Sequence, residues 1–202
     1  SASFGCEEND RERLALWPES AYITSERFWI GTFQTEETFT AGMVAGLPIE
    51  RWQDHPDVDA LSRQLSTSGH AHALLQVQHT PRTREGCQAR LFCWGMPAPI
   101  RVRGGVIEPL HSTPALVLRP GDYLVLIENG YLIATGQDWQ QIATSIRRWT
   151  ETGCDATQLL DCLLRTRQRL ARSRGVAADT QQVAILTVYV RPRVSATVWT
   201  GP

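Results

Sequence analysis

The stretch GDYLVLIENGYL, from Gly121 to Leu132, joins an apolar run to a polar break. The uninterrupted apolar run over residues 123–127 predicts a buried strand. It ends in a predicted polar turn over residues 128–130. Strand ends are where folds commonly place binding and catalytic residues. An acid at such an end can hold a metal ion, whereas the neutral amide of Asn129 holds one poorly. The residue at position 129 therefore bears on whether the protein is an enzyme.

Two helices and a last strand are predicted after this stretch. The segment DWQQIATSIRRW has Asp138 as its N-cap and places Ile142 and Ile146 on the inward face. The segment DATQLLDCLLRTRQRLARSRG begins with a capping box formed by Asp155 and Gln158. The apolar segment VAILTVYV follows and predicts a strand.

The residues before the stretch predict strands, two helices and then strands again. SAYIT and ERFWIGTF alternate as two strands do. A helix is predicted from Glu37 to Ala45, because acids precede a segment rich in Ala and Gly. A second helix is predicted between Pro56 and Gly69. From His70 onward the period is that of strands, in HALLQVQHT, CQARLFCWG, PIRVRGG and ALVL.

This order of elements predicts an α+β protein with two antiparallel sheets covered by helices, not alternating βαβ units. The length of 202 residues fits one domain. No repeat or low-complexity linker divides it. We therefore expect a single domain over residues 1–190 and a C-terminal tail over residues 191–202.

Composition excludes several classes of function. The net charge of −1 gives no basis for binding nucleic acid or a membrane surface. All 20 basic residues are arginine, so Schiff-base chemistry and a P-loop, which need lysine, are excluded. The five cysteines lack C-x-x-C spacing, which argues against zinc and against a secreted disulfide scaffold. With no apolar run long enough to span a membrane and no signal peptide, we expect a cytoplasmic protein.

Taken together, these segments resemble the metal-dependent PPM (type 2C) Ser/Thr protein phosphatases and their sporulation-phosphatase relatives, over roughly Phe4 to Val190. The resemblance implies a four-layer α-β-β-α sandwich. GDYLVLIENGYL resembles the family's G-D-x-L-L-L-x-S-D-G-L, and its metal-binding Asp falls on Asn129. Counting back from Ala41 and Gly42 puts the family's metal-bridging D-G on Gln34 and Thr35.

The other two metal positions fall near the ends of the chain. GCEENDRE resembles the N-terminal family pattern, with Arg11 in place of the metal-binding Asp. QQVAILTV resembles the last pattern, with Gln181 in place of its Asp. The resemblance also implies that Gln34 and Asn129 lie close together at one end of the two sheets.

The resemblance implies a site without its metal ligands. Family members hold two Mg²⁺ or Mn²⁺ ions that activate a bridging water, and such ions need carboxylate oxygens. None of the four matching positions is anionic: Arg11, Gln34, Asn129 and Gln181. We therefore expect no metal cofactor and no catalysis, and a pseudophosphatase that binds or regulates another protein, such as a kinase or signalling protein. The alternative is an active phosphatase with a divergent Mn²⁺ or Mg²⁺ site, because Asp10, Glu128 and Asp179 lie near the expected positions.

Three further features bear on function, and the first two have two interpretations each. His70 and His72 point the same way in a strand, as metal ligands or as strand-edge residues. Arg165, Arg169 and Arg172 end a helix, as a solvated face or as a site for an anion or partner. Ser1 is formally a nucleophile of the Ntn-hydrolase type, a class with the same layers.

Overall fold

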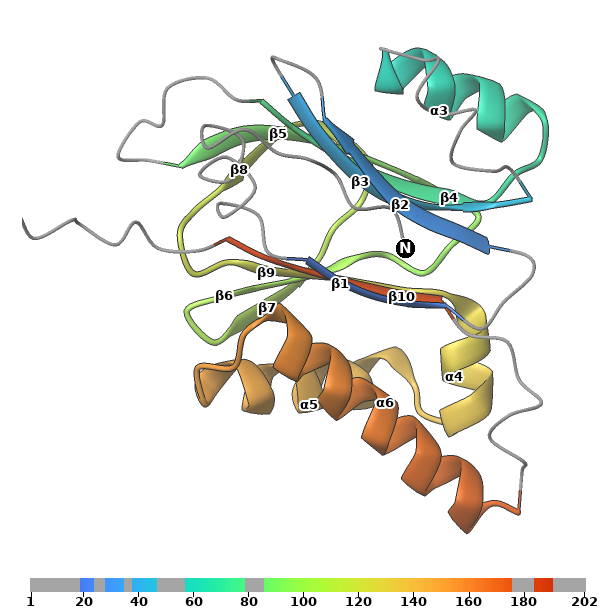
Figure 1. Ribbon diagram of the computed structural model, residues 1–202, viewed down its shortest axis with the longest axis vertical. Coiled ribbons are helices and arrows are strands. Elements are labelled where there is room, and N and C mark those ends of the chain that lie inside the picture. Colours follow the sequence, from blue (N-terminus) through green and yellow to red (C-terminus); the bar gives the residue numbers. More distant parts are fainter. Residues whose placement is uncertain are drawn as a thin grey trace, which may run out of the picture.

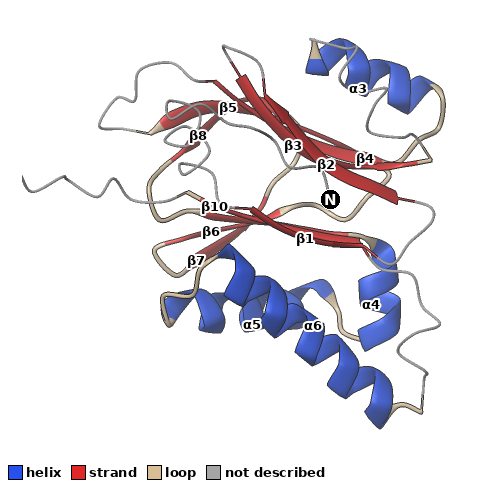
Figure 2. Cartoon of the chain, in the orientation of Figure 1, coloured by secondary structure: helices blue, strands red, loops and turns tan. Residues whose placement is uncertain are grey.

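The computed structural model describes residues 19–23, 28–34, 38–46, 57–78, 86–175 and 184–190. These residues form two five-stranded antiparallel sheets packed face to face, with helices on both outer faces (Figure 1). Figure 2 shows the four layers in the order helix, sheet, sheet, helices. The predicted α-β-β-α fold class is confirmed.

The two sheets draw their strands from both halves of the chain. Sheet A has the order β1 (Glu19–Ile23), β10 (Ala184–Tyr189), β9 (Tyr123–Ile127), β6 (Ile100–Arg103) and β7 (Val106–Pro109). Sheet B has the order β2 (Phe28–Gln34), β3 (Thr38–Ala45), β4 (His72–Gln78), β5 (Cys87–Trp94) and β8 (Thr113–Leu118). The Pro-Gly turn after β8 carries the chain from sheet B to sheet A, so β8 and β9 do not form a hairpin.

Helices cover the two sheets unequally. Sheet B is covered by α3 (Val58–Thr67), which contacts β4 and β5. Sheet A is covered by α4 (Asn129–Thr135), α5 (Trp139–Glu151) and α6 (Ala156–Ser173) (Figure 2). The N-cap predicted at Asp138 and the capping box predicted at Asp155 and Gln158 are confirmed, and Asp138 also forms a capping box with Gln141.

Successive strand residues face opposite sides of a sheet. The buried residues therefore form three cores, one between the sheets and one on the outer face of each sheet. Between the sheets, Phe39, Ala41 and Met43 of β3 meet Leu124 and Leu126 of β9. A second core joins the outer face of sheet A to its three helices. The third core is small and lies under α3, where five fully buried residues meet: Val44, Val58, Leu61, Leu65 and Leu74.

Two predicted elements are wrong. The segment expected as a helix from Glu37 to Ala45 contains the strand β3, which pairs with β2 on one side and β4 on the other. Its small residues serve close strand packing instead: a Cβ on Gly42 would lie 2.8 Å from the carbonyl oxygen of Ala73. The polar turn expected over residues 128–130 is the start of α4, which the sequence did not predict. The edge strand β7 was also not predicted.

The edge strands β7 and β8 each contain a proline. Pro109 ends β7, and Pro114 lies near the start of β8. The pairing of β8 with β5 also shifts in register between Ala89 and Leu91. A proline lacks the amide hydrogen that a sheet ladder needs, so its usual place in a sheet is at an edge.

Candidate functional site

The amide of Asn129 lies at the end of β9, as the first residue of α4. Its side chain is exposed. The preceding residue, Glu128, donates its backbone N–H to the carbonyl of Ala184, 3.2 Å away, at the start of β10. Ile23, the last residue of β1, pairs with Ala184. The ends of β1 and β9 and the start of β10 therefore lie at one end of sheet A, which we call the Asn129 end.

Sheet B has a matching strand end at Ala45 and Gly46. Ala45 pairs with Phe28, at the start of β2, and donates its N–H to the carbonyl of Ala71 at 2.8 Å. Four residues separate the end of β1 from the start of β2 along the chain. Figure 1 shows β2 starting on the same side of the molecule as α4. The end of β3 therefore lies at the Asn129 end of the sandwich.

The prediction that Gln34 lies beside Asn129 is wrong. Gln34 is the last residue of β2, six residues beyond Phe28, which places it about 20 Å further along the strand. It therefore lies at the opposite end of sheet B, where β2 turns back to β3. Thr35 is outside the described residues. The error arose because the segment of β3 was expected to be a helix. The family's metal-bridging D-G was therefore assigned to the end of the preceding strand, β2.

In sheet B, β3 ends at the Asn129 end, with Ala45 as its last residue and Gly46 directly after it. Gly46 has a φ of 73°, a left-handed conformation that glycine adopts without strain. Neither side chain carries an oxygen. With the exposed amide of Asn129, three positions at this end lack a carboxylate.

The donors that the structure describes at this end do not fit a pair of hard divalent cations. Among the residues that the structure describes, no group of three or more His, Cys, Asp or Glu side chains could hold a metal ion. Glu128 is one buried carboxylate beside Asn129, whereas two such cations need several carboxylate oxygens. The other predicted residues lie outside the described part of the chain: Ser1, Asp10, Arg11, Asp179 and Gln181.

His72 ties α3 to sheet B. It is fully buried, and its Nδ1 donates to the carbonyl of His70 at 2.9 Å. Its Nε2 accepts from the hydroxyl of Ser62 in α3 at 2.8 Å. The second hydrogen bond requires a neutral ring, and burial lowers the pKa of His72 below its ordinary value of 6.5. Both ring nitrogens are engaged, which favours a structural role over metal ligation.

We expect His72 to make the protein less stable in mild acid. Its folded-state pKa is lowered, so below pH 6.5 the unfolded chain binds a proton that the folded protein does not. The stabilisation is therefore complete above pH 6.5 and is lost as the pH falls toward the folded-state value. Urea unfolding between pH 8 and pH 5 measures it. His72→Gln should reduce this loss, whereas His111→Gln, at an exposed position, should not. Equal pH dependence in wild type and His72→Gln would refute the assignment.

A partly buried ion pair that the sequence did not indicate holds the turn between β8 and β9. Arg103 donates from Nε to Asp122 Oδ1 at 2.7 Å and from Nη2 to Asp122 Oδ2 at 2.6 Å. The backbone N–H of Arg119 also donates to Asp122 Oδ2, at 2.8 Å. Asp122 is the acid of the G-D pair that opens the stretch at Gly121. Its bonds make it a structural residue and not a ligand.

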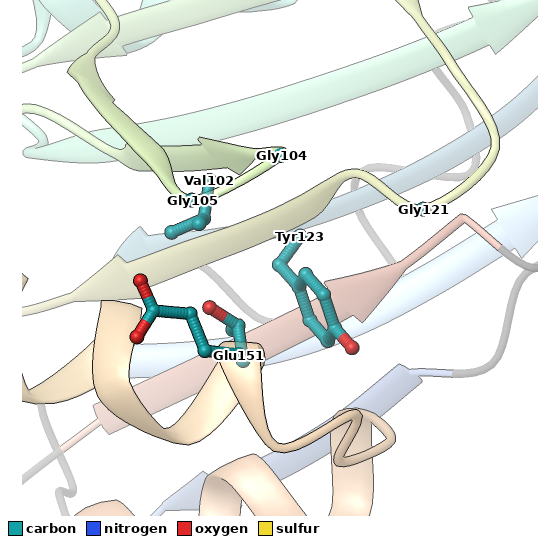
Figure 3. A pocket seen from close by; sticks show the side chains of 7 residues that line it. Val102, Gly104, Gly105, Gly121, Tyr123 and Glu151 are labelled. Atoms are coloured by element: carbon teal, nitrogen blue, oxygen red, sulfur yellow. The ribbon is translucent and has the colours of Figure 1, made fainter.

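A pocket of about 380 Å³ lies at the other end of sheet A, where β9 begins (Figure 3). Glycines of two tight turns, Gly104, Gly105 and Gly121, form part of its wall. Tyr123 and Glu151 reach it from β9 and α5, and the Tyr123 hydroxyl donates to the carbonyl of Cys154. It contains none of the predicted site residues.

The structure brings Arg165, Arg169 and Arg172 onto one face of α6. All three side chains are exposed. They lie at positions i, i+4 and i+7, which share a helix face. None of the helices that the structure describes is both long and apolar enough to cross a membrane.

Comparison with known proteins gives structural likenesses alone. By sequence, the chain matches no protein-family model and no curated protein. By structure, it resembles the phosphatase domain of SpoIIE from Bacillus subtilis, with a TM-score of 0.56 and 10% identity, covering 93% of this chain and 97% of that one. It resembles the SiaA PP2C domain of Pseudomonas aeruginosa with a TM-score of 0.59 and 12% identity, covering 91% of this chain and 89% of that one.

Two longer structures match over part of their length. The RsbU and RsbW domains of Rv1364c from Mycobacterium tuberculosis match with a TM-score of 0.61 and 14% identity, covering 87% of this chain and 61% of that one. The chain spans 63% of a longer SpoIIE fragment that includes part of the regulatory domain. The arrangement of sheets and helices agrees in all of these comparisons. The chain therefore has the fold of the PPM (PP2C-type) phosphatases.

Proposed function

We propose that the protein is a catalytically inactive, phosphatase-like domain that binds and regulates another protein. The observation that carries the proposal is Asn129, a neutral amide at the strand end where the resemblance places a metal-binding aspartate. The matching end of β3, at Ala45 and Gly46, offers no side-chain oxygen. A phosphatase-type domain without ligands for its metals keeps a surface that can bind a protein.

The physical reason is the charge of the missing groups. Mg²⁺ and Mn²⁺ are held by carboxylates whose negative charge offsets that of the ion. An amide oxygen is uncharged, and a methyl group or a hydrogen provides no ligand. Replacing several carboxylates removes most of the electrostatic attraction, so a metal-activated water is not formed.

The second candidate is an active phosphatase with a divergent Mn²⁺ or Mg²⁺ site. The observation that favours it is Glu128, a buried carboxylate directly before Asn129. A single carboxylate at this end would need further acids from elsewhere in the chain. Asp10 and Asp179 are the other two acids that lie near expected metal positions in the sequence.

We expect the wild-type protein to hydrolyse no p-nitrophenyl phosphate with millimolar Mn²⁺, and its melting temperature not to respond to the metal. A metal site in the folded protein would add about 2.7 kcal/mol to the free energy of unfolding when Mn²⁺ is present at a hundred times its Kd. Differential scanning fluorimetry would detect such a site as a rise in the melting temperature. Asn129→Asp provides the matched variant, because it restores one carboxylate beside Glu128. It should respond to Mn²⁺ more than the wild type does. Metal-dependent turnover that Glu128→Gln or Asp179→Ala abolishes would establish the second candidate instead.

A further inference from the structure

We propose that the exposed face of α6 formed by Arg165, Arg169 and Arg172 binds an acidic segment of the partner protein. We call this face the arginine strip. The inference rests on the proposed protein-binding function and adds the place of contact and the chemistry of the partner. It concerns a surface on α6, which packs against α4, the helix that begins at Asn129.

The side of α6 opposite the strip is buried. Leu159 and Leu163 belong to the core that α6 shares with sheet A, and Ala171 is also buried. Arg172 lies seven residues beyond Arg165, which is about 10 Å along the helix axis. Figure 1 shows α6 on the outer side of sheet A, with its C-terminal part extending past the strands. A partner can therefore approach the strip without displacing any described element.

The guanidinium groups of the strip form no ion pair with any residue in the described ranges. Two arginines of other helices are paired one turn away, Arg63 with Asp59 in α3 and Arg147 with Glu151 in α5, whereas Arg148 of α5 forms no ion pair within the described ranges. Asp161 lies one turn before Arg165 on α6, but no such pair forms between them. Like charges at these spacings repel each other weakly. The strip is therefore a row of positive charge that the described protein leaves uncompensated.

The helix dipole explains the position of only one of the three arginines. Cations are favoured at a helix C-terminus, and the effect falls off within the last turn. Arg172 is the basic residue of the last turn of α6. Arg165 lies two turns further from the end, and Arg169 one turn. Neither position gains from the dipole as Arg172 does, so these two arginines require another explanation.

The chemistry that fits the strip is a short row of carboxylates on a polypeptide. A guanidinium binds a carboxylate through two parallel hydrogen bonds. Glutamates at i, i+4 and i+7 of a partner helix would match the spacing of the arginines. A net charge of −1 for the whole chain does not favour long polyanions such as DNA, nor an anionic membrane. We therefore assign the strip to an acidic protein segment.

The experiment uses the full chain and a designed probe. The probe is a fluorescein-labelled alanine-rich helical peptide with glutamate at i, i+4 and i+7, and its twin has glutamine at these positions. Fluorescence anisotropy in low salt measures binding. Arg165→Glu, Arg169→Glu and Arg172→Glu are combined in one variant. The matched control combines Arg90→Glu, Arg119→Glu and Arg148→Glu, which are exposed arginines elsewhere, so that both variants have the same net charge.

We expect the glutamate peptide to bind the wild type, and the strip variant to bind it on the order of tenfold more weakly. The control variant should lose far less. Equal loss in both variants would mean that only net charge matters and would overturn the proposal, as would equal binding of the glutamine peptide. Tighter strip-dependent binding to phosphatidylserine vesicles or to duplex DNA would overturn the choice of partner. Melting curves of both variants exclude misfolding as the cause.

The outcome is separable from that of the proposed function. Turnover with Mn²⁺ would refute catalytic inactivity and leave the peptide result standing. Loss of the peptide result would refute the strip as a contact site, while the absence of turnover and of metal binding would still support an inactive domain.

Discussion

Replacing Arg103 with methionine should lower the free energy of unfolding by about 3 kcal/mol, because it leaves the buried carboxylate of Asp122 without its counter-charge. Asp122 is 1% exposed, and the Arg103 side chain 31%. Arg103 Nη2 also donates to the carbonyl of Val117 at 2.7 Å, so the substitution breaks a backbone contact too. For a chain of this length the melting temperature should fall by roughly 6 to 12 °C.

The control for this prediction is Arg63→Met. Its ion pair with Asp59 is exposed, with 71% and 46% of the two side chains accessible, and such pairs contribute less than about 1 kcal/mol. Chemical denaturation of both variants gives the comparison. A loss at Arg103 no larger than that at Arg63 would show that the Arg103–Asp122 pair does not hold the turn between β8 and β9.

Truncating Leu61 to alanine should cost about 3 kcal/mol and should act mainly on α3. Leu61 is 1% exposed and lies in the smallest of the three cores. Removing a buried leucine side chain leaves a cavity, for which losses of roughly 2 to 5 kcal/mol are usual. Because α3 contacts mainly β4 and β5 among the elements that the structure describes, its amides should lose hydrogen-exchange protection before those of the central strands do.

The matched variant is Gln64→Ala, at an exposed position of the same helix. It should change neither stability nor exchange by much, since alanine favours helix and no core contact is lost. Hydrogen exchange followed by mass spectrometry distinguishes local from global opening. Uniform loss of protection over α3 and β9 in Leu61→Ala would show that α3 is not a separate unit of stability.

Elements with a strong local pattern could be predicted from the sequence. Asp138 and Asp155 each precede an apolar helical face and have glutamine three residues later, so the starts of α5 and α6 were predictable. The strand β9 could be predicted from its own apolar run alone. These patterns arise within one element and do not depend on what packs against it.

The segment of β3 could not be predicted, because its residues suit two structures. Ala41 and Gly42 are compatible with a helix, and the period of two in Phe39, Ala41 and Met43 is weak when alanine and glycine interrupt it. The strand forms because β2 and β4 pair with it on both sides, which is a tertiary effect. The same error affected the predicted site. Asn129 was correctly placed at a strand end, whereas Gln34 was assigned to the wrong end of sheet B.

The prolines of the edge strands bear on self-association. An unprotected edge is a template for adding a strand from another chain, which leads to domain exchange and fibrils. Pro109 in β7 and Pro114 in β8 cannot donate to such an added strand, and the register shift beside β8 bends that edge further. Strand addition at these two edges is therefore disfavoured, in copies of this chain and in any partner peptide alike. The other two edge strands, β1 and β2, contain no proline, so this protection covers one edge of each sheet.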